Sequence, residues 1–198
     1  MHIVGITGPS GSGKSLLGKY LSSKSLPVIN ADEVYHSLLI PPSECLDKLR
    51  AAFGNDIFTG DGSLDRKKLA SLVFGDKTKL ALLNATVLDG VLKETREIIK
   101  QYEDNGASVV FVDAPTLIES GFHKECNTVI SVIASKEIRI ERIILRDNIT
   151  KAKAEERIFA QKSDDFYYSH SDFVIINNTT EESFLSQAKT VLKGIIDL

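Results

Sequence analysis

Five short apolar runs recur along the chain, at residues 3–7, 26–30, 108–113, 128–134 and 172–177. Runs of this length that contain Val and Ile are typical of strands buried on both faces of a parallel sheet. The stretches after the first and last runs, residues 16–21 and 181–196, carry apolar residues at helical spacing. The alternation predicts an α/β fold, an α/β/α sandwich around a five-stranded parallel sheet.

The alternation of strand and helix lapses between residues 41 and 106. Three stretches there have helical periodicity, residues 46–53, 67–73 and about 77–102, and Asp61-Gly62-Ser63 forms a turn. No Pro-, Gly- or Ser-rich linker separates this region. We therefore expect one domain over residues 1–198, with its core at 1–32, 107–138 and 170–198 and a helical insertion at about 33–106.

Composition and charge exclude several classes of protein. The chain has 198 residues, 42% of them hydrophobic and 26% charged, and a net charge of −3, which argues against coating of nucleic acid. Cys45 and Cys126 lack metal-ligand spacing, so we expect reduced thiols. No apolar run reaches the ~18 residues of a membrane span, and the first strand leaves no room for a signal peptide. We expect a cytoplasmic protein that binds neither nucleic acid nor membranes.

The first strand leads into Gly8-Pro9-Ser10-Gly11-Ser12-Gly13-Lys14-Ser15 and then into a helix, which is the order of a P-loop. Glycines let the backbone turn its N–H groups inward, and with the helix N-terminus these form a cradle for a polyphosphate. Lys14 would meet the β- and γ-phosphates, and the Ser15 hydroxyl would hold Mg²⁺. The flanking strand and helix disfavour a chance Gly/Ser-rich turn. We expect nucleotide contacts from Gly8, Gly11, Ser12, Gly13, Lys14, Ser15 and Leu16.

Asp32 follows the second strand. The carboxyl ends of parallel strands meet at one edge of a sheet, so Asp32 is expected at the same edge as the phosphate cradle. The alternative is that Asp32 only caps the helix that begins there. His36 lies four residues further on, on the same helix face, and is a candidate for the site or a structural residue.

Asp113 ends the third apolar run, in the manner of a Walker-B strand. A carboxylate at that position can lie beside Mg²⁺, directly or through water. The alternative is a turn or helix cap ahead of Pro115.

Arg139, Arg142 and Arg146 share one face of a predicted helix, at i, i+3 and i+7. No carboxylate lies three or four residues from Arg142 or Arg146, so an external anion or acids elsewhere in the fold must neutralise them. Guanidinium groups suit phosphate oxygens. A further predicted helix, residues 151–161, carries Arg157. We expect residues 139–169 to form a mobile lid over the nucleotide.

Beyond the P-loop, the most specific motif runs from Asp61-Gly62-Ser63-Leu64-Asp65-Arg66 to Val73-Phe74. Further motifs are Asn30-Ala31-Asp32-Glu33-Val34-Tyr35-His36, Asp113-Ala114-Pro115-Thr116-Leu117-Ile118-Glu119, Arg146-Asp147-Asn148 with Arg157 and Gln161, and Asp172-Phe173-Val174-Ile175-Ile176-Asn177. On these motifs the chain resembles the dephospho-CoA kinase family over nearly its whole length.

The chain departs from the family pattern in four places, two of which are residue pairs. Asn30 replaces an acid, Thr116 replaces Leu, Leu88-Asp89 replaces a His-Pro pair of the acceptor site, and Tyr167-Tyr168 replaces basic residues. The acceptor half therefore matches the family less well than the nucleotide half does.

The resemblance implies ATP- and Mg²⁺-dependent phosphorylation of the ribose 3′-hydroxyl of dephospho-CoA. The site residues expected on this basis are Asp32, Lys14, Arg142 and Arg146 for catalysis, Asp32, His36, Arg66 and Arg157 for the acceptor, and Ser15 and Asp113 for Mg²⁺. Two alternatives stay open, a kinase of another nucleotide such as a nucleoside monophosphate and a nucleotide-dependent regulatory protein. We expect a monomer or a small homo-oligomer.

Overall fold

The computed structural model describes residues 1–196, and the chain divides into two compact units. The first consists of Met1–Ile29 together with the chain from Tyr102 onward, and the second of Asn30–Gln101. We call them the core unit and the insertion unit. Within the described residues, no helix is long and apolar enough to cross a membrane.

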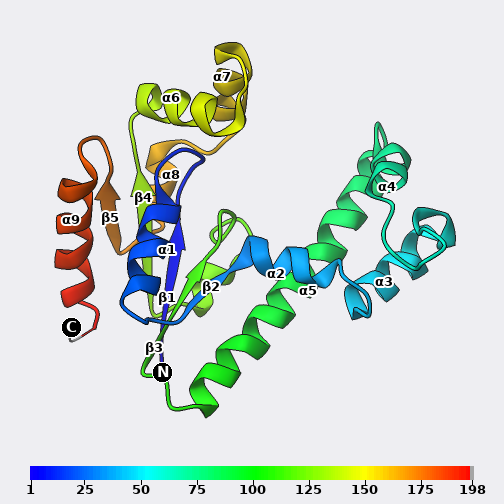
Figure 1. Ribbon diagram of the computed structural model, residues 1–198, viewed down its shortest axis with the longest axis horizontal. Coiled ribbons are helices and arrows are strands. Elements are labelled where there is room, and N and C mark those ends of the chain that lie inside the picture. The colour runs from blue at the N-terminus through cyan, green and yellow to red at the C-terminus, as the bar shows by residue number, and fades with distance from the viewer. Residues whose placement is uncertain (197–198) are drawn as a thin grey trace. The chain divides into compact units, whose positions relative to one another are not determined.

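A five-stranded sheet forms the centre of the core unit (Figure 1). Its strands are β1 (His2–Thr7), β2 (Val28–Asn30), β3 (Val109–Asp113), β4 (Thr128–Ile133) and β5 (Phe173–Ile176), in the order β2-β3-β1-β4-β5. The β1–β3, β1–β4 and β4–β5 pairs are parallel. The predicted α/β fold with a five-stranded parallel sheet is thus confirmed.

Two helices, α1 (Lys14–Ser23) and α9 (Glu181–Lys193), pack on the sheet. In Figure 1, α9 (red) runs beside β5 (orange). Leu17 and Leu21 of α1 and Phe184 of α9 are fully buried with side chains of β1, β3, β4 and β5. Burying an apolar side chain of this size contributes about 1.5–3 kcal/mol, so this layer fixes where α1 begins relative to the sheet.

The arginine-rich segment forms a helical hairpin of α6 (Lys136–Asp147) and α7 (Lys151–Phe159). Ile140 and Ile143 of α6 pack against Ala154 and Ile158 of α7. Asn148 ends α6 in the left-handed conformation, with φ of 49°, and Thr150 caps α7 by accepting the N–H of Lys153. The hairpin therefore has a small apolar core of its own.

The insertion unit is helical. It contains α2 (Ala31–Leu38), α3 (Glu44–Phe53), the 3₁₀ turn η1 (Asn55–Ile57), α4 (Arg66–Val73) and most of α5 (Lys77–Asp104). Leu46 and Leu49 of α3, Ile57 of η1 and Leu69 of α4 are buried in one apolar cluster, against which Leu83 and Val87 of α5 pack. The three helices predicted here are present.

Several boundaries differ from the predicted ones. The second strand begins at Val28 instead of residue 26, and the closing helix ends at Lys193 instead of residue 196. Helix α8 (Asp164–Ser169) was not predicted, because six residues give too short a periodic signal. A 3₁₀ turn, η2 (Phe122–Glu125), was also missed.

Candidate active site

The P-loop has the backbone that its glycines predict. β1 ends at Thr7 and α1 begins at Lys14. Gly8, Gly11 and Gly13 have φ angles of 146°, 80° and 98°, which side chains rarely allow. A Cβ on Gly8 would lie 2.2 Å from the carbonyl oxygen of Val132, and one on Gly13 would lie 2.0 Å from Nδ2 of Asn177. Only glycine fits at these two positions.

The register of the sheet brings two polar residues to the carboxyl end of β1. Asp113, the last residue of β3, pairs with Ile6 of β1. Asn177 directly follows β5, and its N–H donates to the carbonyl oxygen of Ile133 at 2.8 Å. Thr7, the residue before the P-loop, pairs with Ser131 of β4. Asp113 and Asn177 therefore flank the P-loop.

Lys14 and Asp113 form an ion pair. The Lys14 side chain is 16% exposed and that of Asp113 is 8% exposed, so the pair is largely withdrawn from water. Ser15, the second residue of α1, is exposed. Among residues 1–196, no three His, Cys, Asp or Glu side chains cluster as ligands of a metal ion.

The three arginines of α6 contact the P-loop. Arg139, 4% exposed, donates from Nε to the carbonyl oxygen of Ser10 at 3.1 Å. Arg142 donates from Nη1 to the carbonyl oxygens of Gly11 and Ser12 at 3.2 and 3.3 Å. Arg146 donates from Nη2 to Oγ of Ser10 at 3.3 Å. Burial lowers the pKa values of Arg139 and Arg142.

Asp147 joins two arginines of the α6–α7 hairpin. Arg146 donates to both of its oxygens, at 2.7 and 2.9 Å, and Arg157 of α7 donates to Oδ2. Hydrogen bonds from Arg146 and Arg157, with their positive charges, lower the pKa of Asp147 to about 2. An acid outside the i±3 and i±4 positions thus pairs with Arg146, namely its direct neighbour Asp147. Arg139 has an acid from another helix, because its Nη1 atom lies 3.7 Å from Oδ1 of Asp164 of α8.

In the insertion unit, Asn30 and not Asp32 caps helix α2. The Oδ1 atom of Asn30 accepts the N–H groups of Asp32 and Glu33 at 2.9 and 3.3 Å. The helix begins at Ala31, so Asp32 lies inside its first turn, and its side chain is exposed. The capping alternative for Asp32 is therefore wrong. His36 is exposed on the same helix, with its ring 5.3 Å from that of Tyr35.

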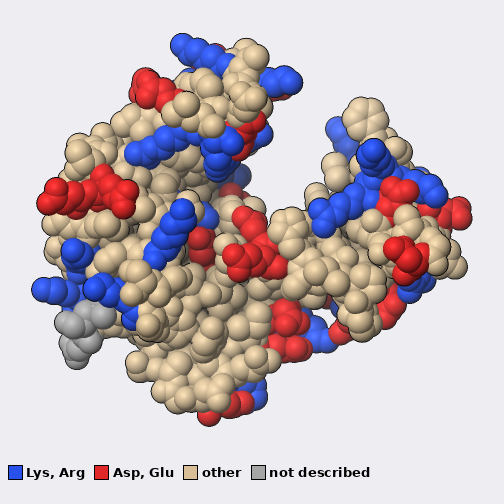
Figure 2. Space-filling model, viewed as in Figure 1, with Lys and Arg blue, Asp and Glu red and all other residues tan. Residues whose placement is uncertain are grey.

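Arg66 is the first residue of α4. Asp65 caps this helix by accepting the N–H groups of Lys67 and Lys68 at 3.1 and 3.0 Å. Arg66, Lys67 and Lys68 are all exposed. Basic side chains gather over α4 in Figure 2, so this end of the insertion unit is suited to an anionic group.

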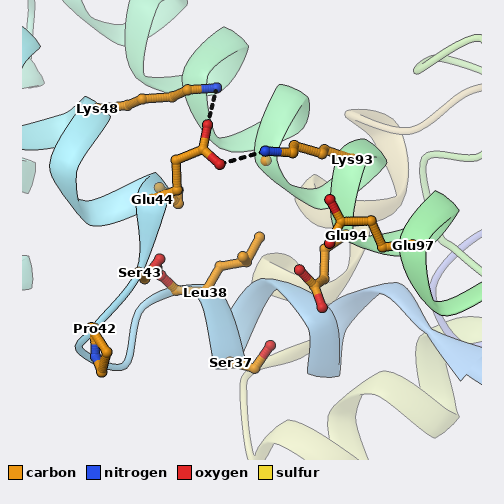
Figure 3. A pocket seen from close by; sticks show the side chains of 11 residues that line it. Ser37, Leu38, Pro42, Ser43, Glu44, Lys48, Lys93, Glu94 and Glu97 are labelled. Atoms are coloured by element: carbon orange, nitrogen blue, oxygen red, sulfur yellow. Dashed lines mark hydrogen bonds and ion pairs between the residues drawn. The ribbon is translucent and has the colours of Figure 1, made fainter.

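The insertion unit also contains a pocket of about 300 Å³ between α2, α3 and α5 (Figure 3). Glu44 bridges Lys48 and Lys93 across it, at 3.4 and 2.5 Å. Lys48 also binds Asp89 at 2.8 Å, the residue that departs from the family pattern. The departure at Asp89 therefore supplies an ion pair beside the pocket.

The core unit brings together most of the residues predicted for the nucleotide: the P-loop with Lys14, Asp113, Arg142 and Arg146. Arg157, predicted for the acceptor, is linked to Arg146 through Asp147. Asp32, His36 and Arg66 belong to the insertion unit. Sequence reasoning missed the contacts of Asn177, although this residue ends the last apolar run and the last of the family-like motifs.

A family model described as dephospho-CoA kinase matches residues 2–182. The dephospho-CoA kinase of Corynebacterium glutamicum is 34% identical over 193 residues, which cover 98% of this chain and 96% of that protein.

Solved structures agree in fold. The structure of TT1252 from Thermus thermophilus has a TM-score of 0.79 and 29% identity, with 98% of each chain covered. Dephospho-CoA kinase from Campylobacter jejuni has a TM-score of 0.71 at 22% identity, also over 98% of each chain, and this likeness shows the fold alone. The P-loop geometry and the nearly complete match to the family model lead to one assignment: the chain belongs to the dephospho-CoA kinase family.

Proposed function

We propose that this protein transfers the γ-phosphoryl group of ATP to the ribose 3′-hydroxyl of dephospho-CoA, giving CoA and ADP. In this reaction the 3′-oxygen forms a bond to phosphorus, the bond to the β–γ bridging oxygen breaks, and the hydroxyl proton leaves to a base. The observation that carries the proposal is the family match over residues 2–182 in a chain with an intact P-loop.

The P-loop would hold the donor. Residues Gly8 to Leu16 would surround the triphosphate. The backbone N–H groups of the loop and of the first turn of α1 would donate hydrogen bonds to its oxygens. Lys14 would leave Asp113 and move to the β- and γ-phosphates, because a triphosphate offers more negative charge than one carboxylate. The ion pair keeps the lysine beside the loop until then.

Ser15 and Asp113 suit Mg²⁺ as one hydroxyl and one carboxylate, since this ion takes few protein ligands and completes its shell with phosphate oxygens and water. When bound, Mg²⁺ neutralises the charge that develops on the transferring group. Asp113 lies at the end of β3, in the same unit as the P-loop. Its role depends on release of Lys14.

The lid would supply further positive charge. Arg146 is 58% exposed and Arg157 is 44% exposed, and both are held near the P-loop through Asp147 and Ser10. Phosphoryl transfer depends mostly on positioning and on neutralisation of charge. We assign Arg142 and Arg146 to the transferring phosphoryl group and Arg157 to the acceptor.

Asp32 would take the proton of the 3′-hydroxyl. It is exposed in the first turn of α2, and Asn30, not Asp32, caps that helix. His36 would contact the acceptor from the same helix, and Arg66 would bind an acceptor phosphate from the start of α4. We further propose a cytoplasmic enzyme that is a monomer or small homo-oligomer.

A coupled assay of ADP release tests the proposal. The purified protein is offered dephospho-CoA, AMP, CMP and dTMP, and the product is identified by its mass. We expect turnover with dephospho-CoA and little turnover with the monophosphates. The KM for dephospho-CoA should be raised, because Leu88-Asp89 replaces the His-Pro pair of the acceptor site. The Asp32→Asn variant, purified in parallel, excludes a contaminating kinase. A higher kcat/KM for any nucleoside monophosphate would overturn the substrate assignment.

A further inference from the structure

Three successive carbonyl groups of the P-loop point at side chains from distant segments. The oxygen of Ser10 accepts from Arg139, that of Gly11 from Arg142, and that of Ser12 from Arg142 and Asn177. The shortest of these bonds joins Nδ2 of Asn177 to the oxygen of Ser12, at 2.8 Å. In Figure 1, α6 lies at the end of the sheet where the loop between β1 and α1 emerges.

These bonds fix the direction of the opposite N–H groups. A trans peptide unit is planar, and its C=O and N–H point in opposite directions. When the carbonyl of Ser12 is held on Asn177 and Arg142, the N–H of Gly13 must point away from them. The carbonyl of Ser10 likewise directs the N–H of Gly11. The P-loop binds phosphate through such N–H groups.

Asn177 and Arg142 also hold each other. Nη2 of Arg142 donates to the carbonyl oxygen and to Oδ1 of Asn177, at 3.1 and 3.2 Å. This leaves Nδ2 of Asn177 directed at Ser12 and fixes the orientation of the amide. Asn177 is 3% exposed, so its bonds do not compete with bulk water.

Gly13 shows how closely the pair approaches the loop. A Cβ on Gly13 would lie 2.0 Å from Nδ2 of Asn177 and 3.8 Å from Nη1 of Arg142. The glycine therefore serves two needs, a positive φ and room for the Asn177 amide.

We propose that Asn177 and Arg142 are positioning residues for nucleotide binding, acting together through the Ser12–Gly13 peptide. They hold the P-loop N–H groups toward the phosphates before the nucleotide arrives, so that binding does not have to order the loop. The proposal deepens the proposed kinase function and rests on it for the identity of the nucleotide. It differs from the role over the transferring phosphoryl group assigned to Arg142 above, because a positioning residue acts on ADP and ATP alike.

Binding of ADP, measured by calorimetry without acceptor, tests the proposal. Asn177→Ala removes the donor to Ser12, and Asn177→Asp keeps the shape and the bond from Arg142 but places an acceptor against the Ser12 carbonyl. We expect each variant to bind ADP about tenfold or more weakly, the scale of one lost buried hydrogen bond. In both variants the KM for ATP should also rise, while the KM for the acceptor should stay the same.

Asn178→Ala is the matched control. Oδ1 of Asn178 accepts the N–H of Ser135 at 2.7 Å, so this neighbour holds another loop and does not touch the P-loop. We expect its melting temperature to change while ADP affinity does not. If Asn177→Ala and Asn177→Asp fold and bind ADP like the wild type, the proposal is overturned.

A double-mutant cycle separates positioning from direct contact. If Asn177 and Arg142 act through one peptide, the double variant Asn177→Ala/Arg142→Ala should lose little more ADP affinity than the worse single variant. Losses that add fully would mean that Arg142 contacts the nucleotide by itself, and the joint role would be overturned. Because ADP binding needs no acceptor, these results stay interpretable even if the acceptor is not dephospho-CoA.

Discussion

Lys14 and Asp113 are paired with each other, although each is proposed to serve the nucleotide, one through the phosphates and the other through Mg²⁺. Asp113 is buried at the end of β3 and Lys14 begins α1. The pair gives the buried carboxylate a counter-charge in the absence of nucleotide, and this has a consequence for any variant of Lys14.

Lys14→Ala should lower kcat/KM by about 10²–10³-fold or more, the scale for loss of a charge-stabilising group. It should also lower the free energy of unfolding by about 1–3 kcal/mol, because Asp113 loses its partner while still buried. Lys14→Ala/Asp113→Asn should recover stability and remain inactive. Lys19→Ala, an exposed lysine on the same helix, is the control. A folded Lys14→Ala variant with near wild-type turnover would contradict the P-loop assignment.

Asp32→Asn should lower kcat by about 10²–10⁴-fold with little change in stability, because it removes only the base. The structure supplies the reverse control. Asn30→Ala removes the cap of α2 and should cost about 1 kcal/mol of stability with little loss of kcat. Steady-state kinetics and thermal unfolding of both variants check this, and an Asp32→Asn enzyme that turns over normally would rule out the base.

Arg66→Ala should raise KM for the acceptor and leave KM for ATP nearly unchanged. A lost charged hydrogen bond to phosphate is worth about 1.5–3 kcal/mol, so the expected rise is about tenfold or more. Lys67→Ala is the matched control, since Lys67 is the next residue and is also exposed. Equal changes in both variants would indicate a general effect of charge on α4 instead of a contact.

Asp147 should make the α6–α7 hairpin, the proposed lid, sensitive to acid. Its pKa of about 2 lies below the ordinary value for Asp of about 3.9. The pair with Arg146 and Arg157 therefore stabilises the protein above pH ~4, and this contribution is lost as the pH falls toward 2.

Asp147→Asn tests this. The difference in unfolding free energy from the wild type should be fully present at pH 6 and should be much smaller near pH 2. Glu156→Gln, an exposed acid on α7, is the control. A difference that does not change between pH 6 and pH 2 would mean that the ion pair contributes nothing to lid stability.

The sequence by itself determined the fold class, the P-loop and the family. Apolar runs of strand length, the spacing of Gly8, Gly11 and Gly13, and the motif around Asp61 to Arg66 are local, so they can be read without a structure. The positions of α3, α4 and α5 also followed from helical periodicity. The roles of the site residues stay predictions for the variants above.

Only the tertiary structure decided what the charged and amide side chains contact. Sequence reasoning placed Arg142 on a face with no acid along its helix, and the structure shows its partners to be the carbonyls of Gly11, Ser12 and Asn177. Asn30, and not Asp32, caps α2, because β2 ends at Asn30 and this fixes where the helix begins. Asn177 lies 165 residues from Ser12. Such contacts depend on strand register and on packing between distant segments, for which local spacing carries no signal.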